Sequence, residues 1–179
     1  MILYIHGFRT TIDSDKSKQL KFYFKDDIII ADYPSAPQDA IAYLSEMTEK
    51  EDITGIIASS LGGFYATYLG ARYGLKTVLI NPSVEPHNTT RKFLGKVDRM
   101  DGTTFPWEEK HLKELSLLWV NNLVTDDYCL FLKRGDVVLD YRVAEDRYAG
   151  AQMFIEDGGE HSFVDFDRYI KEAKEFLHI

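Results

Sequence analysis

The sequence predicts an α/β protein in which about six mostly parallel strands form a doubly wound sheet with helices on both faces. Short apolar, β-branched runs alternate along the chain with amphipathic segments of helical length, an alternation typical of parallel strands joined by crossover helices. The runs are apolar on both faces, as in strands buried under helices on both sides. A length of 179 residues suits one hydrophobic core, so we expect a single domain over 1–179.

Each predicted element corresponds to one run of the sequence. The apolar runs predict strands at 2–5, 27–31, 53–58, 76–80, 128–133 and 151–155. The amphipathic segments between them predict helices at about 14–24, 37–50, 61–73, 107–123, 138–148 and 165–178. Pro37 stands at a first-turn position, where its missing N–H is tolerated. Asp165 is expected to cap the last helix.

The segment 81–106 interrupts this alternation. It contains Asn-Pro-Ser-Val-Glu-Pro and Asp-Gly-Thr-Thr-Phe-Pro-Trp, which are rich in turn-forming residues. Loops of this length inside a compact domain are usually lids or binding loops. We therefore expect a lid-like insertion at about 81–123, with an ordinary surface excursion as the alternative.

The strongest functional signal in the chain is a serine at the junction of a strand and a helix. An apolar run ends abruptly at Ser60, and a helical pattern begins with the next residue. This is the layout of a nucleophile elbow, a strained strand-to-helix turn that presents a reactive serine. The positions two before and two after that serine must be small, and they are Ala58 and Gly62. Choosing Ser59 instead would put Ile57 at a crowded position. A structural turn without chemistry is the alternative interpretation.

A serine nucleophile needs a base, and the base needs an acid that orients it. His161 follows the last predicted strand, in a glycine-rich turn that can carry its side chain back toward Ser60. Asp136 follows strand 128–133 and is placed to hold the imidazole in the tautomer that accepts the serine proton. Asp140 is the rival acid, but it is better placed to cap the following helix. The remaining histidines compete less well by position: His6, His87, His111 and His178.

The oxyanion of a tetrahedral intermediate needs two backbone N–H donors. One is expected from Leu61, directly after the serine, and the other from Phe8 in the loop after the first strand. Gly7 lets that loop approach the nucleophile, and His6 is then a structural residue of the turn. A metal site built from histidine and aspartate is not expected, because ligand-type spacing is lacking.

Charge, hydropathy and the absence of certain motifs argue against several kinds of partner and cofactor. The net charge is −8 and the basic residues are spread along the chain, so nucleic acid and anionic membranes are poor partners. With no run of about 18 apolar residues and no leader pattern, we expect a cytoplasmic protein without a membrane span. Without a phosphate-binding glycine loop or a dinucleotide fingerprint, we expect no cofactor. The only cysteine, Cys129, lies in an apolar run and is expected to be buried.

Five segments spread over the chain form a recognisable set of motifs. They are Tyr4-Ile-His-Gly-Phe8, Ile57-Ala-Ser-Ser60-Leu-Gly-Gly-Phe-Tyr-Ala-Thr67, Ile80-Asn-Pro-Ser83, Gly135-Asp-Val-Val-Leu-Asp-Tyr141 and Gly158-Gly-Glu-His161-Ser-Phe. With the terminal helix they resemble the YqiA/YcfP-type small bacterial esterases over nearly the whole chain. The resemblance implies a minimal α/β-hydrolase fold that lacks the first antiparallel strands, and a Ser60–Asp136–His161 triad. Ala58 departs from the glycine expected at its position.

These observations predict a serine esterase that hydrolyses small acyl esters or thioesters through an acyl-enzyme. The first alternative is a binding or scaffold protein with this fold and little turnover. It would be favoured if the insertion sealed the crevice, or if His161 pointed away from Ser60. The second is acyl transfer to an acceptor other than water. The sequence indicates neither the acyl chain and leaving group nor the oligomeric state.

Overall fold

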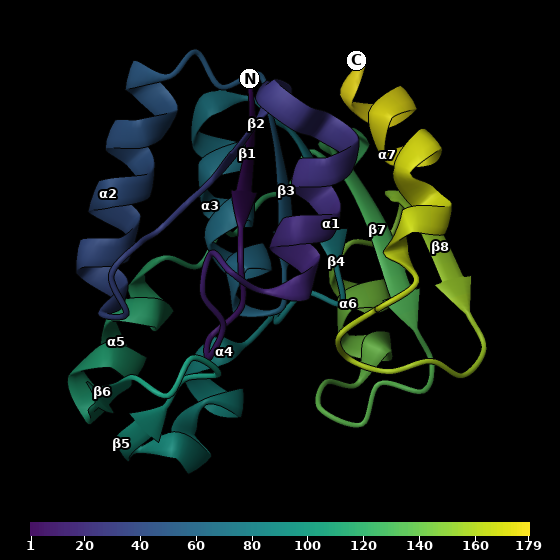
Figure 1. Ribbon diagram of the computed structural model, residues 1–179. Coiled ribbons are helices and arrows are strands. Elements are labelled where there is room, and N and C mark those ends of the chain that lie inside the picture. The colour runs from purple at the N-terminus through teal and green to yellow at the C-terminus, as the bar shows by residue number, and fades with distance from the viewer.

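Six parallel strands form the centre of the protein in a computed structural model that describes all 179 residues (Figure 1). Their order across the sheet is β2-β1-β3-β4-β7-β8. The bounds are β1 (Ile2–Ile5), β2 (Ile28–Ile30), β3 (Gly55–Ser59), β4 (Lys76–Ile80), β7 (Tyr128–Lys133) and β8 (Gln152–Glu156). The predicted fold class is confirmed, and every predicted strand lies within two residues of an observed one.

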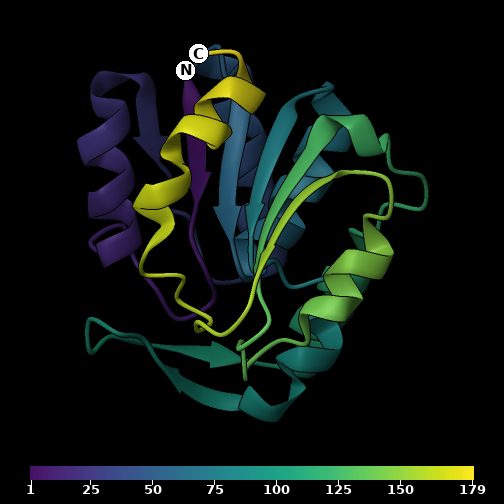
Figure 2. The ribbon, with the colours of Figure 1, turned by 90° about the vertical axis from the view of Figure 1, so that its right-hand side faces the viewer.

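Helices cover both faces of the sheet. On one face lie α1 (Asp15–Phe24) and α7 (Ile170–Leu177), and on the other lie α2 (Pro37–Lys50), α3 (Leu61–Tyr73) and α6 (Tyr141–Arg147) (Figure 2). Short 3-10 turns link several elements: η1 (Lys25–Asp27), η2 (Arg91–Phe93), η3 (Thr125–Asp127) and η4 (Phe166–Tyr169). None of the helices is long and apolar enough to cross a bilayer.

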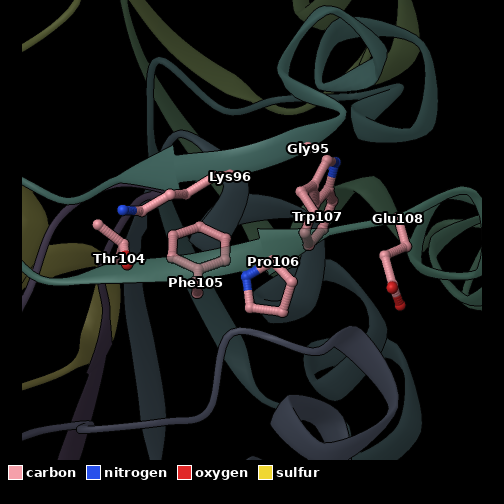
Figure 3. Close-up of a pocket in the computed structure, with 7 residues that line it drawn as sticks. All are labelled: Gly95, Lys96, Thr104, Phe105, Pro106, Trp107 and Glu108. Carbon is pink, nitrogen blue, oxygen red and sulfur yellow. The ribbon is translucent and has the colours of Figure 1, made fainter.

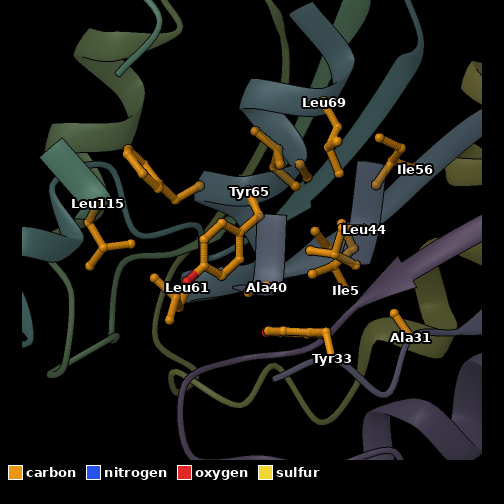
Figure 4. Packing of buried hydrophobic residues seen from close by; sticks show 14 of the residues in the cluster. Ile5, Ala31, Tyr33, Ala40, Leu44, Ile56, Leu61, Tyr65, Leu69 and Leu115 are labelled. Atoms are coloured by element: carbon orange, nitrogen blue, oxygen red, sulfur yellow. The ribbon is translucent and has the colours of Figure 1, made fainter. Parts of the chain in front are cut away.

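Alternate residues of each strand contribute their side chains to two separate hydrophobic cores, because successive side chains of a strand point to opposite faces. Ile2 and Tyr4 of β1 join the core under α1 and α7, whereas Leu3 and Ile5 join the core under α2 and α3. Figure 4 shows part of the second core, which is the larger and includes Leu115 from the insertion. The insertion therefore shares the hydrophobic core that also holds α2 and α3 against the sheet.

The segment between β4 and β7 is more regular than its turn-rich sequence suggested. It holds α4 (Pro86–Thr89), the antiparallel pair β5 (Gly95–Asp98) and β6 (Thr104–Trp107), and α5 (Glu109–Leu117). Figures 1 and 2 show the hairpin beneath the carboxyl ends of the parallel strands. The sequence did not predict this hairpin, since its two four-residue strands pair only with each other.

Three predicted helices have different bounds from those expected. The helix predicted at 107–123 is α5, because Trp107 pairs in the hairpin and residues 118–124 are irregular. The helix predicted from 138 begins at Tyr141, where the Asp140 carboxylate caps it. At the end of the chain, Asp165 makes no cap; its carboxylate bonds Lys133 instead, and α7 starts five residues later.

The close approach of α3 to β1 depends on Gly62, two residues after the serine. A Cβ atom at this position would lie 2.2 Å from the Ile5 carbonyl oxygen and 2.4 Å from the His6 carbonyl oxygen. Both neighbours are backbone atoms at the end of a central strand, so they cannot move aside. The predicted need for a small residue here is explained by this contact.

We expect Gly62→Ala to destabilise the protein by about 3 kcal/mol or more, because the added methyl group collides with β1. Gly74→Ala is the matched control, since Gly74 has open space around it but a φ of +65°. It should lose about 1–2 kcal/mol from backbone strain alone. Urea unfolding measures both, and equal losses would contradict the packing argument.

Candidate active site

Ser60 occupies the strained turn between β3 and α3. Its φ of 53° and ψ of −125° are unfavourable for a residue with a side chain. Backbone hydrogen bonds hold this turn: the Ser60 N–H donates to the Ile80 carbonyl (3.1 Å), and the Ser60 carbonyl accepts from Ser83 N–H (2.9 Å) and Gly63 N–H (3.0 Å). The turn therefore fixes Ser60 at the carboxyl edge of the sheet, with its side chain pointing out of the strand-helix junction.

Three side chains from three strand ends meet in a chain of hydrogen bonds. His161 Nε2 lies 2.9 Å from Ser60 Oγ, and His161 Nδ1 lies 2.7 Å from Asp136 Oδ2. The Asp136 side chain is 2% exposed and that of His161 is 24% exposed. The acid is thus shielded from water, while the imidazole and the serine can be reached from outside.

Backbone donors fix the Asp136 carboxylate. Its Oδ1 atom accepts from Val138 N–H (2.8 Å) and Leu139 N–H (3.0 Å), which leaves Oδ2 to the imidazole. The rival, Asp140, faces away from the site: it caps α6 and pairs with Arg142. The structure therefore brings together the acid, base and serine that the sequence singled out, and it leaves Asp140 outside.

The loop after β1 lies directly against the serine. A Cβ atom on Gly7 would be 3.1 Å from Ser60 Cβ, so only glycine allows this approach without a shift. The next residue, Phe8, donates no hydrogen bond from its N–H to the rest of the protein. Leu61 begins α3, so its N–H has no acceptor within the helix. Two free donors thus flank Ser60.

His6 stabilises this loop rather than joining the hydrogen-bonded side chains. Its Nδ1 atom contacts Thr10 Oγ1 (3.2 Å) and the Gly7 carbonyl (3.0 Å), and its ring stacks on Tyr33 at 4.5 Å. The Tyr33 hydroxyl donates to the His6 carbonyl at 2.6 Å. Burial lowers the pKa of His6 below its ordinary value of 6.5. The neutral ring therefore suits this site.

Aromatic side chains connect the insertion to the same loop. Phe8 packs edge-on against Phe105 (5.4 Å) and Trp107 (4.6 Å) of β6 and contacts Phe93 (5.6 Å). Trp107 and Phe105 are buried, whereas Phe8 and Phe93 are partly exposed at the edge of the cluster. The hairpin consequently fixes the position of the loop that carries the Phe8 N–H.

A hollow of about 330 Å³ runs along the hairpin (Figure 3). It is lined by Gly95, Lys96, Thr104, Phe105, Pro106, Trp107 and Glu108. None of these residues belongs to the hydrogen-bonded trio. The hydrogen-bonded side chains at Ser60 and the lining of this hollow are therefore separate sets of residues.

A buried ammonium group holds both ends of the loop that carries His161. Lys133, at the end of β7, is 3% exposed and pairs with Glu156 before the loop and with Asp165 after it (2.9 Å). Burial lowers the pKa of Lys133, but the hydrogen bonds to Glu156 and Asp165 outweigh burial and hold that pKa above its ordinary value. The loop is thus clamped by a charged lysine.

The sequence alone did not identify Tyr33 or Lys133 as part of this region. Tyr33 follows β2 and Lys133 ends β7, so both stand where carboxyl ends of parallel strands converge. A polar residue at the carboxyl end of a parallel strand is the sequence signal that could have placed both of them near the site. Cys129, as expected, is buried within β7, and burial raises the pKa of its thiol to about 12.

Comparison with known protein families matches residues 1–178 to one family, described as an uncharacterised protein family (UPF0227). The chain belongs to the UPF0227 family. A UPF0227 protein of Shewanella woodyi is 30% identical over 154 residues, which cover 82% of this chain and 81% of that protein. A UPF0227 protein of Shewanella oneidensis is 28% identical, with 98% of each chain covered. The resemblance stated from the sequence motifs is thereby confirmed.

Solved structures show that this UPF0227 chain has the α/β-hydrolase fold. Mouse alpha/beta hydrolase domain-containing protein 10 superposes with a TM-score of 0.73 at 13% identity, covering 99% of this chain and 89% of the mouse chain. Est1E from Butyrivibrio proteoclasticus, solved with ferulic acid bound, superposes with a TM-score of 0.70 at 14% identity, covering 99% and 87%. The esterase domain of a Rhodothermus marinus protein superposes with a TM-score of 0.67 at 15% identity, covering 96% of this chain and 83% of that chain. The fold is therefore similar to that of an esterase.

The stability of the protein is expected to fall on acidification in a way that depends on His6. Below the ordinary histidine pKa the unfolded chain binds a proton that the folded protein, with its lowered His6 pKa, does not. Acid therefore favours the unfolded state. We expect the stability advantage of wild type over His6→Gln to shrink between about pH 7.5 and pH 5.5. Urea unfolding across this range tests it, and a constant difference would contradict it.

Proposed function

We propose that the protein is a serine hydrolase that cleaves small carboxylic esters or thioesters through an acyl-enzyme. The observation that carries the proposal is the continuous hydrogen-bonded chain from Ser60 through His161 to Asp136, at 2.9 and 2.7 Å. The strained turn at Ser60 and the esterase-like fold support it. In this proposal Ser60 is the nucleophile, His161 the general base and Asp136 the orienting acid.

The proposed reaction has two halves. Ser60 Oγ attacks the acyl carbonyl carbon while His161 Nε2 takes the hydroxyl proton, and the tetrahedral intermediate collapses as the imidazolium protonates the leaving alcohol or thiol. Water then enters, gives its proton to the same nitrogen, and attacks the acyl-enzyme. Collapse of the second intermediate returns the proton to Ser60 and releases the acid. Asp136 stays ionised and stabilises the imidazolium in both halves.

We assign the oxyanion hole to the N–H groups of Leu61 and Phe8. Both donors flank Ser60 and lack acceptors in the protein, so neither must break a bond to bind the developing negative charge. A donor of this kind contributes about 10²–10³ in rate. His6, Gly7 and Gly62 support this arrangement by shaping the two turns.

We further propose that the chain is a single α/β-hydrolase domain over 1–179 in which the segment at about 81–123 acts as a lid-like insertion. Support comes from its position beneath the strands' carboxyl ends and from the aromatic contacts between its hairpin and Phe8. The binding-protein alternative would be favoured by a histidine turned away from the serine, whereas His161 Nε2 lies 2.9 Å from Ser60 Oγ. Acyl transfer differs from hydrolysis only in the acceptor, and added alcohol competing with water for the acyl-enzyme distinguishes them.

Ser60→Ala should abolish both turnover of p-nitrophenyl esters and labelling by a fluorophosphonate probe, because no nucleophile remains. The loss of kcat/KM should be at least about 10³-fold. Ser59→Ala is the matched control, since Ser59 Oγ bonds only the Tyr4 hydroxyl (2.9 Å), and it should keep probe labelling. Peptide mass spectrometry should locate the adduct on Ser60. Folded wild-type protein with neither adduct nor turnover would overturn the proposal.

Asp136→Asn should lower kcat by about 10³–10⁴-fold, because an amide donor at this position favours the histidine tautomer that cannot accept the serine proton. Asp140→Asn is the control: asparagine caps a helix as well as aspartate does, so activity should stay within about twofold. Steady-state kinetics on one activated ester compares the two. An equal effect of both substitutions would remove Asp136 from the proposed mechanism.

A further inference from the structure

The segment Ile80-Asn-Pro-Ser83 takes no direct part in the proposed reaction, yet it contacts two members of the proposed triad. It begins at the last residue of β4, which lies between the strand that precedes Ser60 and the strand that precedes Asp136. At its two ends it bonds the nucleophile turn: Ile80 accepts from Ser60 N–H, and the Ser83 N–H donates to the Ser60 carbonyl. Between these bonds stands Asn81.

The Asn81 side chain reaches the base. Its Nδ2 atom donates to the carbonyl of His161 (3.1 Å) and to that of Glu160 (3.3 Å). Its Oδ1 atom accepts from the backbone N–H of Lys133 (2.9 Å). The residue is 3% exposed, so water does not compete for these bonds. One buried amide thus joins the end of β7 to the backbone of the loop that carries His161.

Only asparagine meets all the local requirements. The backbone of Asn81 has a φ of +40°, a region that asparagine enters more readily than most residues. The side chain must donate toward two carbonyls and accept from one N–H, and a primary amide does both. Aspartate has the same shape but can only accept when ionised, and its charge would face the two carbonyl oxygens.

We propose that Asn81 is a positioning residue that sets the distance between His161 and Ser60. The turn that carries Asn81 is bonded to the backbone of Ser60 on one side and of His161 on the other. Lys133 clamps the two ends of the His161 loop through ion pairs, whereas Asn81 is bonded to the residue that carries the imidazole. This inference deepens the proposed function and rests on it.

The test compares Asn81→Asp with wild type and with Gln152→Glu, an amide-to-carboxylate change at an exposed residue of β8. Fluorophosphonate labelling of Ser60 and kcat/KM for a p-nitrophenyl ester are measured on protein whose fold is verified by circular dichroism. We expect Asn81→Asp to lower the labelling rate and kcat about 10- to 100-fold with KM within about twofold. Gln152→Glu should match wild type.

A second readout separates positioning from general loss of structure. The proton between His161 Nδ1 and Asp136 should give a low-field signal in the NMR spectrum of wild type, and we expect this signal to move or broaden in Asn81→Asp. If Asn81→Asp does not fold, the same measurements are made on Asn81→Gly, because glycine tolerates the same backbone conformation. This variant should show the same selective loss of kcat.

The outcomes separate this inference from the function on which it rests. If folded wild-type protein is neither labelled by the fluorophosphonate probe nor active on the p-nitrophenyl ester, the proposed function itself is wrong. A reactive wild type with Asn81→Asp labelled at the same rate, and with an unchanged imidazole signal, overturns the positioning role. Failure of both Asn81 variants to fold also overturns it, in favour of a purely structural role.

Discussion

The close contact between α3 and β1 is the constraint on which the rest of the site depends. Because Gly62 carries no side chain, the helix starts against the carbonyl oxygens of Ile5 and His6. This contact requires a tight turn before the helix, and Ser60 takes a strained positive-φ backbone that costs about 1–3 kcal/mol. The same approach brings the loop with Gly7 against Ser60. The strained backbone of Ser60 and the close approach of the Gly7 loop therefore both follow from this one packing contact.

Parallel strands explain why so few residues suffice to build the site. All carboxyl ends lie on one edge, and the strand order changes direction between β1 and β3, where a crevice is expected. The loop after β1 and the turn after β3 border that crevice. The second edge of the site comes from β7 and β8, whose following loops supply Asp136 and His161. Lys133 then neutralises the carboxylates that flank the histidine loop.

The sequence predicted most of the sheet because strands such as β1 and β7 are continuous apolar runs, and burial on both faces leaves that signature. It also selected the three side chains that meet, since each follows such a run. The hairpin escaped prediction because its two strands are short and pair only with each other, and because Phe105 and Trp107 pack against Phe8, which lies far away in the sequence. The same limit applies to Asp165. A local pattern predicted a cap, but a buried lysine 32 residues away offered a stronger partner.

The strand order also dictates where a positioning group can stand. Ser60 and Asp136 follow strands that are two places apart, and two interstrand spacings amount to about 10 Å. An imidazole with hydrogen bonds of 2.9 and 2.7 Å on its two sides spans most of that distance. The strand between them is β4, so the turn that follows β4 must pass beneath the histidine. A residue in that turn is the one group that can reach both neighbouring strand ends at once, and Asn81 is compact enough to do so in a left-handed conformation. The geometry of the sheet, more than the chemistry of the proposed triad, therefore accounts for an amide at this position.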